Sequence, residues 1–179
     1  MTAHRLPALL LLPLMMMMSL GGAAHAQNAT PTNRLIDYDA FAANVAAVAP
    51  LRESRLISEA QFIRMAREPG TVVLDARSER MYARRHVKGA ANLSFPEFTE
   101  ATLARTIPSK NTRVLIYCNN NFIGAPESLE MKHVSSALNV STFVSLYSYG
   151  YRNVYELGPS IDFPRSALPF AGTEVRTSR

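Results

Sequence analysis

The chain has 179 residues, with 19 basic and 14 acidic side chains and a formal net charge of +5. This length suits a single domain with its own hydrophobic core. The basic excess is small and the basic residues are dispersed, apart from a cluster at Arg80, Arg84, Arg85 and Lys88, so no nucleic-acid partner is expected. We interpret the cluster as a solvated helix face, with steering of anions as the alternative.

The first residues have the features of a secretory signal peptide. Met1–Arg5 carries one positive charge, Leu6–Leu20 is almost wholly apolar, and Ala24-His25-Ala26 fits a cleavage site. The predicted mature chain begins at Gln27 and keeps a formal charge of +4, because only Arg5 is lost. An uncleaved membrane anchor is the alternative, although the apolar stretch is shorter than the ~20 residues of a membrane span. We expect a periplasmic protein without membrane contact after cleavage.

Three parts are expected to follow residues 1–26, the signal peptide. Residues 27–54 form a mature N-terminal segment, residues 55–164 the domain, and residues 165–179 a C-terminal tail.

The N-terminal segment contains one predicted helix. Tyr38, Phe41, Val45 and Val48 recur at helical spacing up to Pro50, so we expect this helix to pack on the domain.

Helices and strands are expected to alternate from Ser58 onward. Ser58 and Gln61 form a capping box at the start of a helix that ends before Pro69. The further expected elements, in chain order, are a strand at 71–74, a helix at 78–85, a strand at 91–95, a helix with a loop at 96–107, a strand at 113–117, a helix at 142–149 and a strand at 153–157. This alternation predicts an α/β fold with a mostly parallel central sheet and helices on both faces.

Cys118 is the only cysteine of the chain and directly follows the apolar run Val114–Tyr117. Such a run predicts a strand buried on both faces, and ligand sites in open α/β sheets lie beyond the carboxyl ends of these strands. A single cysteine cannot form a disulfide within the chain, even in an oxidising compartment. Cys118 is therefore either a small buried hydrophobe or a nucleophile.

A nucleophilic Cys118 would need a pKa below the ~8.5 of a free thiol, because the thiolate and not the thiol is the attacking form. Inward-facing amides of the next loop would lower this pKa and could hold an oxyanion. The candidate substrate-binding loop consists of Asn119, Asn120, Asn121, Phe122, Ile123 and Gly124. Asparagine tolerates left-handed backbone and glycine adds freedom, so the loop could form such a nest; an ordinary surface turn is the alternative.

Four segments in order resemble the single-domain rhodanese-like family, namely Val72–Arg77, His86–Asn92, Val114–Cys118 and Gly150–Leu157. The resemblance extends over about Leu56–Leu157. It implies a small three-layer α/β sandwich in which Cys118 takes the place of the sulfur-carrying cysteine. The implied activity is that of a sulfurtransferase.

The resemblance also suggests supporting roles for residues outside the cysteine loop. Asp75 and Arg77 match the Asp-x-Arg of the family and would brace the neighbouring loop through an ion pair or hydrogen bond. His86 would pack at a helix end, and Gly89 would permit a tight turn. No cofactor or metal site is expected, because the chain has neither a Cys/His ligand set nor a glycine-rich phosphate loop after a strand.

The sequence departs from the family directly after Cys118. Family loops are short and rich in glycine and basic residues, whereas here no lysine or arginine occurs before Lys132. Residues 123–139 look like an insertion before the next helix. Lys132 and His133 could fold back over Cys118 and supply the missing positive charge.

Three functions remain open at this stage. The leading one is a periplasmic sulfurtransferase or sulfur carrier that holds a persulfide on Cys118 and receives it from a small sulfur-containing anion or a persulfide. The second is a weakly catalytic redox or partner-binding module that recognises another exported protein. The third, a phosphatase or arsenate reductase, needs an arginine about six residues after the cysteine, where Gly124 and Ala125 stand.

Overall fold

Five parallel strands form the central sheet, in the order β1-β7-β5-β2-β4. This arrangement is seen in a computed structural model that describes residues 33–175; the predicted signal peptide and the start of the mature chain lie outside these residues. The strands of the sheet are β1 (Leu56–Ile57), β2 (Thr71–Asp75), β4 (Ala91–Asn92), β5 (Arg113–Ile116) and β7 (Val154–Leu157).

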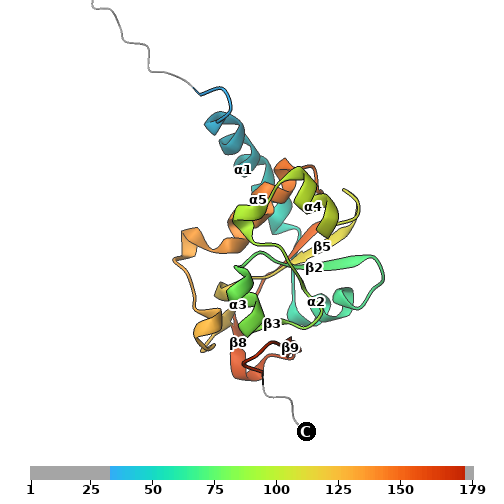
Figure 1. The fold of residues 1–179 in the computed structure, drawn as a ribbon, viewed down its shortest axis with the longest axis vertical. Helices are drawn as coiled ribbons and strands as arrows, with labels where there is room; N and C mark the ends of the chain where they lie inside the picture. Colours follow the sequence, from blue (N-terminus) through green and yellow to red (C-terminus); the bar gives the residue numbers. More distant parts are fainter. Residues whose placement is uncertain (1–32, 176–179) are drawn as a thin grey trace, which may run out of the picture. The chain divides into compact units, whose positions relative to one another are not determined.

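Helices cover both faces of this sheet. The α-helices are α1 (Tyr38–Glu53), α2 (Glu59–Ala66), α3 (Glu79–Arg84), α4 (Glu100–Thr106) and α5 (Leu138–Ser148). In Figure 1, α1, α4 and α5 gather on one side of β2 and β5, and α2 and α3 lie on the other. The predicted α/β sandwich with a mostly parallel sheet is confirmed.

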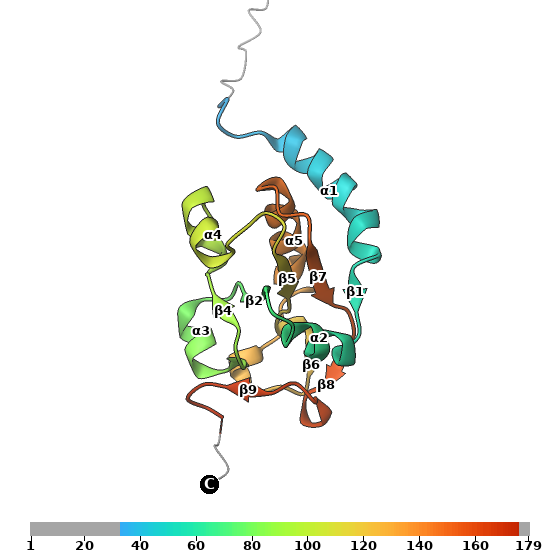
Figure 2. The same cartoon turned by 90° about the vertical axis from the view of Figure 1, so that its right-hand side faces the viewer.

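Two small sheets and several short 3-10 helices complete the domain. Strands β3 (His86–Val87) and β9 (Phe170–Ala171) pair antiparallel, and β6 (Phe122–Ile123) and β8 (Ile161–Asp162) pair in parallel. Figure 2 shows β6 and β8 side by side. The 3-10 helices are η1 (Phe95–Glu97), η2 (Asn119–Asn121), η3 (Glu127–Leu129), η4 (Val134–Ser136) and η5 (Phe163–Arg165).

The central strands are apolar on both faces because each face packs against helices. Leu74 and Ile116 face the core under α1, α4 and α5, whereas Val73 and Leu115 face the core under α2. Side chains alternate along a strand, so the continuous apolar run before Cys118 serves both cores. Packing on both faces consequently fixes the position of the carboxyl end of β5 at the edge of the sheet.

Local sequence signals explain where most helices begin. The predicted capping box of Ser58 and Gln61 is present at the start of α2. Gly150 ends α5 with a φ of 88°, the left-handed conformation expected there. Helix α5 begins at Leu138, four residues before the predicted start, because Ala137 precedes it without any side-chain capping group that the sequence could reveal.

The N-terminal helix differs from its prediction in two respects. Helix α1 continues through Pro50 to Glu53 instead of ending before the proline. Its apolar face is also buried only at Val48, which packs in the core with residues of α5, whereas Tyr38, Phe41 and Val45 are exposed. Only the second half of the helix is therefore held by the hydrophobic core.

The C-terminal segment lies against α3 and β3. Glu174 accepts a hydrogen bond from Arg84 Nε at 2.5 Å, and Gly172 approaches the backbone of Arg84 so closely that a Cβ atom would lie 2.4 Å from its carbonyl oxygen. Across residues 33–175, no helix combines the length and the apolar character needed to cross a membrane.

Candidate functional site

Cys118 lies two residues beyond the carboxyl end of β5, and only 3% of its surface is exposed. The chain turns there into the 3-10 helix η2. The backbone N–H of Cys118 donates to Asn121 Oδ1 at 2.9 Å, and the backbone N–H of Asn121 donates to the Cys118 carbonyl at 3.2 Å. These reciprocal bonds fix the backbone on which the thiol is carried.

Burial raises the pKa of the Cys118 thiol above its ordinary value. The backbone amides of Asn139, Asn120 and Leu138 oppose this effect and lower the pKa, while the carboxylate of Glu156 raises it further. The lowered pKa that we expected of a nucleophilic Cys118 is not found, because loss of solvation outweighs the amide donors. The expected inward-facing amides are present, but they do not prevail in the resting thiol.

Two of these three amides come from α5, not from the loop after the cysteine. Leu138 and Asn139 are the first residues of α5, whose early N–H groups have no partner within the helix. The insertion predicted at residues 123–139 corresponds in the structure to residues 124–137, between β6 and α5 (the inserted segment), and it returns the chain so that α5 begins beside Cys118. Sequence reasoning missed Leu138 and Asn139, because no spacing relates them to the cysteine.

The three asparagines anchor neighbouring segments through their side chains. Asn119 Nδ2 donates to the Glu130 carbonyl at 2.6 Å, and Asn120 bonds the backbone of Lys132. Among residues 33–175 no residue other than glycine has a positive φ, so the expected left-handed asparagines are not found. The asparagines act here through their side-chain amide groups, each of which can both donate and accept hydrogen bonds.

Asn121 connects the turn at Cys118 to the end of β7. Its Nδ2 donates to the carbonyls of Leu157 at 2.7 Å and Pro159 at 3.2 Å, and its Oδ1 is the acceptor for the Cys118 amide. The side chain is 6% exposed, so these bonds satisfy a buried amide.

The remaining residues of the predicted loop, Phe122 to Gly124, have structural roles. Phe122 is 1% exposed and makes edge contacts with Tyr117, Phe163 and Phe170. Ile123 is half exposed and ends β6, and Gly124 has a φ of 69°, which uses the freedom expected of it. Phe122 therefore points into the core and not toward a substrate.

Asp75 and Arg77 form the predicted ion pair at the end of β2. Arg77 donates through Nη2 at 2.5 Å and Nε at 2.9 Å to the two carboxylate oxygens, and Tyr117 Oη also donates to Asp75. Arg77 Nη1 reaches the Ser128 carbonyl of the inserted segment at 2.9 Å. The pair is almost fully buried and connects β2 with the inserted segment, as the bracing role requires.

The predicted supporting residues His86 and Gly89 occupy structural positions. His86 stacks on Tyr82 with ring centroids 3.8 Å apart, and its Nδ1 is 2.7 Å from the Tyr82 carbonyl. Gly89 has a φ of 87°, as a tight turn requires.

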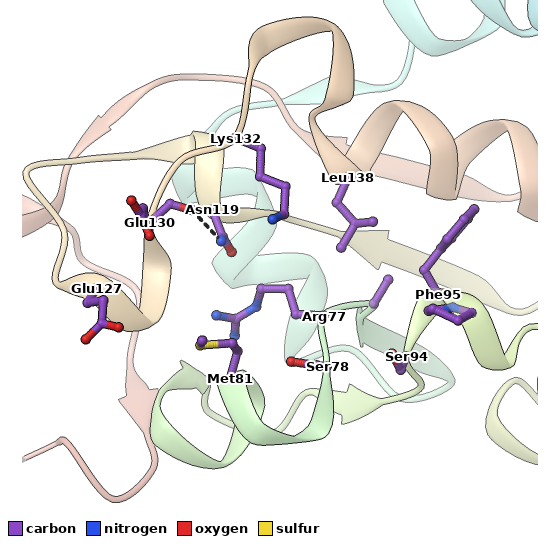
Figure 3. Close-up of a pocket in the computed structure, with 12 residues that line it drawn as sticks. Arg77, Ser78, Met81, Ser94, Phe95, Asn119, Glu127, Glu130, Lys132 and Leu138 are labelled. Carbon is purple, nitrogen blue, oxygen red and sulfur yellow. Dashed lines mark hydrogen bonds between the residues drawn. The ribbon is translucent and has the colours of Figure 1, made fainter.

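Of the two residues expected to fold back over Cys118, Lys132 lies near the cysteine and His133 does not. Lys132 lines a hollow of about 10 Å³ together with Cys118, Arg77 and Leu138, and this hollow adjoins a larger cleft of about 350 Å³. Figure 3 shows Lys132 and Arg77 entering the larger cleft from opposite walls. His133 is exposed and lies 2.9 Å from Ser135 Oγ, so it does not line the hollow beside the cysteine.

A second cleft, of about 480 Å³, is also lined by Cys118. It includes Arg52 from α1 and Glu156 from β7, which form a two-pronged ion pair with distances of 2.5 and 2.6 Å. Neither residue was predicted to lie at the site. Arg52 precedes the region of resemblance altogether. No group of three potential metal-ligating side chains occurs within the described part of the chain.

Comparison with known families identifies the domain. The sequence model of the rhodanese-like domain family matches residues 58–157, which is more than half of the chain. The chain belongs to the rhodanese-like domain family. The match includes Cys118, Asp75, Arg77 and Glu156, whereas α1 with Arg52 precedes it. The rhodanese-like domain associates the chain with sulfurtransferase chemistry in general.

Several solved structures are similar to this rhodanese-like chain. The BH2092 protein of Bacillus halodurans is 21% identical, with a TM-score of 0.49, over 74% of this chain and 88% of that one. The Alr3790 protein of Anabaena sp. is 22% identical, with a TM-score of 0.44, over 66% and 94%. A rhodanese from E. coli with anions is 24% identical, with a TM-score of 0.38, over 57% and 98%. No curated protein sequence matches at a significant level.

Proposed function

We propose that this protein is a periplasmic sulfurtransferase or sulfur carrier, in which Cys118 accepts a sulfane sulfur as a persulfide and passes it to a thiophilic acceptor. One observation carries the proposal: the thiol of a rhodanese-like domain stands at the carboxyl end of β5 with the amides of Asn120, Leu138 and Asn139 facing it. Such amides stabilise negative charge on the outer sulfur of a persulfide.

The loading step conserves atoms and charge. The Cys118 thiol first loses its proton to solvent, and the thiolate attacks the outer sulfur of a donor such as thiosulfate. A sulfur–sulfur bond forms at Cys118 while the donor bond breaks, and sulfite leaves with the electron pair. In the second step a thiol or cyanide attacks the outer sulfur and regenerates the Cys118 thiolate.

Loading is expected to be slow at neutral pH and to accelerate in alkaline solution. Burial holds Cys118 mainly in its neutral form, so only a small share is the attacking thiolate. Asp75, Arg77 and the three asparagines act as positioning residues that keep the turn and the inserted segment in place.

Export rests on the N-terminal sequence. The charged start, apolar stretch and Ala24-His25-Ala26 support cleavage after Ala26 and a periplasmic acceptor, which could be another exported protein. Expression of the full chain in a Gram-negative host, followed by fractionation and N-terminal sequencing, tests this part. A periplasmic protein that begins at Gln27 is expected; retention of residues 1–26 in the cytoplasm would contradict it.

Intact-mass measurement of the reduced mature protein tests the chemistry. Incubation with thiosulfate, and separately with polysulfide, should add the mass of one sulfur atom, and the Cys118→Ser variant should gain none. Addition of cyanide should then return the original mass and release thiocyanate. If alkylation proves the thiol reactive but no sulfur is gained at pH 7 or 9, the sulfurtransferase proposal fails and the weakly catalytic partner-binding module gains support.

A further inference from the structure

The cleft that contains Cys118 and the Arg52–Glu156 pair offers far more space than a thiosulfate ion fills. Its volume of about 480 Å³ lies within the ~300–1,000 Å³ of sites that hold organic ligands. Cys118, which is 3% exposed, lies in its wall together with Asn120 and Asn121. The cleft gives a small molecule a route to this buried sulfur.

The charges in this cleft cancel. Among the described residues that line it, Arg52 and Glu156 are the charged ones, and they pair through two hydrogen bonds of 2.5 and 2.6 Å. Asn139 Nδ2 also donates to Glu156 Oε1 at 3.2 Å, and the Glu156 side chain is 5% exposed. Because Glu156 neutralises Arg52, the cleft offers an incoming anion no uncompensated positive charge, and a dianion loses more attraction from this than a monoanion.

Part of the cleft lining is apolar and open to solvent. Ile123, Met131 and Val134 of the segment around the insertion and Val140 of α5 line it, with exposed fractions from 39% to 77%. These side chains line the same cleft as the nucleophile, so they can bury the organic part of a donor whose sulfur lies against Cys118. Contact with an aromatic ring there would remove apolar surface of both partners from water.

We propose that the Cys118 cleft selects an organic sulfane-sulfur donor, with at most one negative charge and an apolar group, over the thiosulfate dianion. This inference rests on the proposed function and assigns its donor class. Glu156 is a specificity-determining residue, because its carboxylate cancels the charge of Arg52, and the apolar side chains hold the organic group.

Organic thiosulfonates are the probes that represent this class. The Cys118 thiolate attacks the outer sulfur of R–SO₂–S⁻, the sulfur–sulfur bond of the donor breaks, and the sulfinate R–SO₂⁻ leaves with the electron pair. Cys118 keeps the outer sulfur as a persulfide. Thiosulfate, methanethiosulfonate and benzenethiosulfonate form a matched series, since the second donor lowers the charge and the third adds an aromatic ring.

The test compares the rates at which the three donors load Cys118, measured by intact mass. Each rate is divided by the rate of the same donor with N-acetylcysteine, which corrects for intrinsic reactivity. Benzenethiosulfonate should exceed thiosulfate by about tenfold or more, in keeping with burial of an aromatic group. Methanethiosulfonate should lie between them.

Two substitutions assign the preference to the cleft. Val140→Ser should reduce the preference for benzenethiosulfonate over methanethiosulfonate, whereas Val45→Ser, at an equally exposed valine of α1 with a fraction of 39%, should leave it unchanged. Glu156→Gln should accelerate thiosulfate more than benzenethiosulfonate, because it leaves the Arg52 charge uncompensated. The Val140→Ser comparison does not depend on whether Glu156→Gln folds.

The outcomes separate the two proposals. Loading from all three donors with equal corrected rates, or fastest from thiosulfate, would overturn the donor class while the persulfide function stands. A preference for benzenethiosulfonate that Val140→Ser leaves intact would also overturn the cleft assignment. No loading from any donor would overturn the proposed function and this inference with it.

Discussion

Asn120 pairs with the backbone of Lys132 through both polar atoms of its side chain: Oδ1 accepts from the Lys132 N–H at 3.0 Å and Nδ2 donates to the Lys132 carbonyl at 2.7 Å. The side chain thus occupies the place that a neighbouring strand would have in a sheet. Asn119 adds one bond to Glu130. The residues after the nucleophile therefore hold the inserted segment in place.

Asn120→Ala should loosen the inserted segment without unfolding the domain. Each lost hydrogen bond contributes about 0.5–1.5 kcal/mol, so the opening of residues 124–137 should become about 1–3 kcal/mol easier. Hydrogen exchange followed by mass spectrometry should show faster exchange in this segment and little change in β2 and β5. Asn111→Ala, in the exposed turn before β5, is the matched control. Unchanged exchange at 124–137 would contradict the anchoring role.

Asp75→Asn should destabilise the whole domain. Arg77, at 4% exposure, would keep its charge but lose its carboxylate partner, and removal of one member of a buried pair costs about 3–5 kcal/mol. The free energy of unfolding in urea measures the loss. Glu100→Gln breaks the exposed pair with Lys110 and should cost about 1 kcal/mol or less. Similar losses for both variants would argue against the bracing role of Asp75.

The reactivity of Cys118 should rise at alkaline pH. Because burial raises its pKa, the midpoint of the alkylation rate with iodoacetamide should lie above the ~8.5 of a free thiol. The free energy of unfolding should also depend on pH, since the folded state holds the thiol proton more tightly than the unfolded chain and is stabilised by it. This contribution is present below ~8.5 and is lost as the pH rises through the folded pKa.

The chain has one thiol, so the alkylation profile needs no correction for other cysteines. Cys118→Ala provides the blank for slow reactions of other groups. In urea, this variant should lose less stability than the natural protein between pH 8 and pH 10. A midpoint below 8.5 would mean that the amides of α5 outweigh burial in solution.

Gly172→Ala should release the C-terminal strand β9 from β3. A Cβ atom at this position would lie 2.4 Å from the Arg84 carbonyl oxygen, so the two backbones would have to separate. Gly70→Ala is the control, because its φ of 77° is also left-handed but no atom lies within 4 Å of the added Cβ. The control should cost about 1–2 kcal/mol from backbone strain alone. Limited proteolysis near residue 172 should distinguish the variants.

The sheet was predictable because its strands are continuous apolar runs bounded by turn signals. Val114–Tyr117 and Val72–Leu74 lie where their composition indicates, and Ser58 and Gly150 mark helix ends through local capping chemistry. Of the two-residue strands, β4 was predicted, within a longer strand at 91–95, whereas β3 and β9 were not, because pairing between distant segments and not local propensity forms them.

The site was predictable only where one segment supplies it. Cys118 and the Asp75–Arg77 pair follow directly from strand ends. Arg52 and Glu156 are 104 positions apart and meet only in the folded chain. The direction of the Cys118 pKa also depends on burial, which a single sequence pattern does not give.

A sulfur atom bound to Cys118 has no exit within its own chain. Resolution of a persulfide requires a second nucleophile such as a thiol or cyanide, and the sequence contains no other cysteine to provide one from within the chain. Under the proposed function, the lifetime of the persulfide is therefore set by how often an acceptor molecule enters the cleft. The protein would then store sulfur until its acceptor arrives.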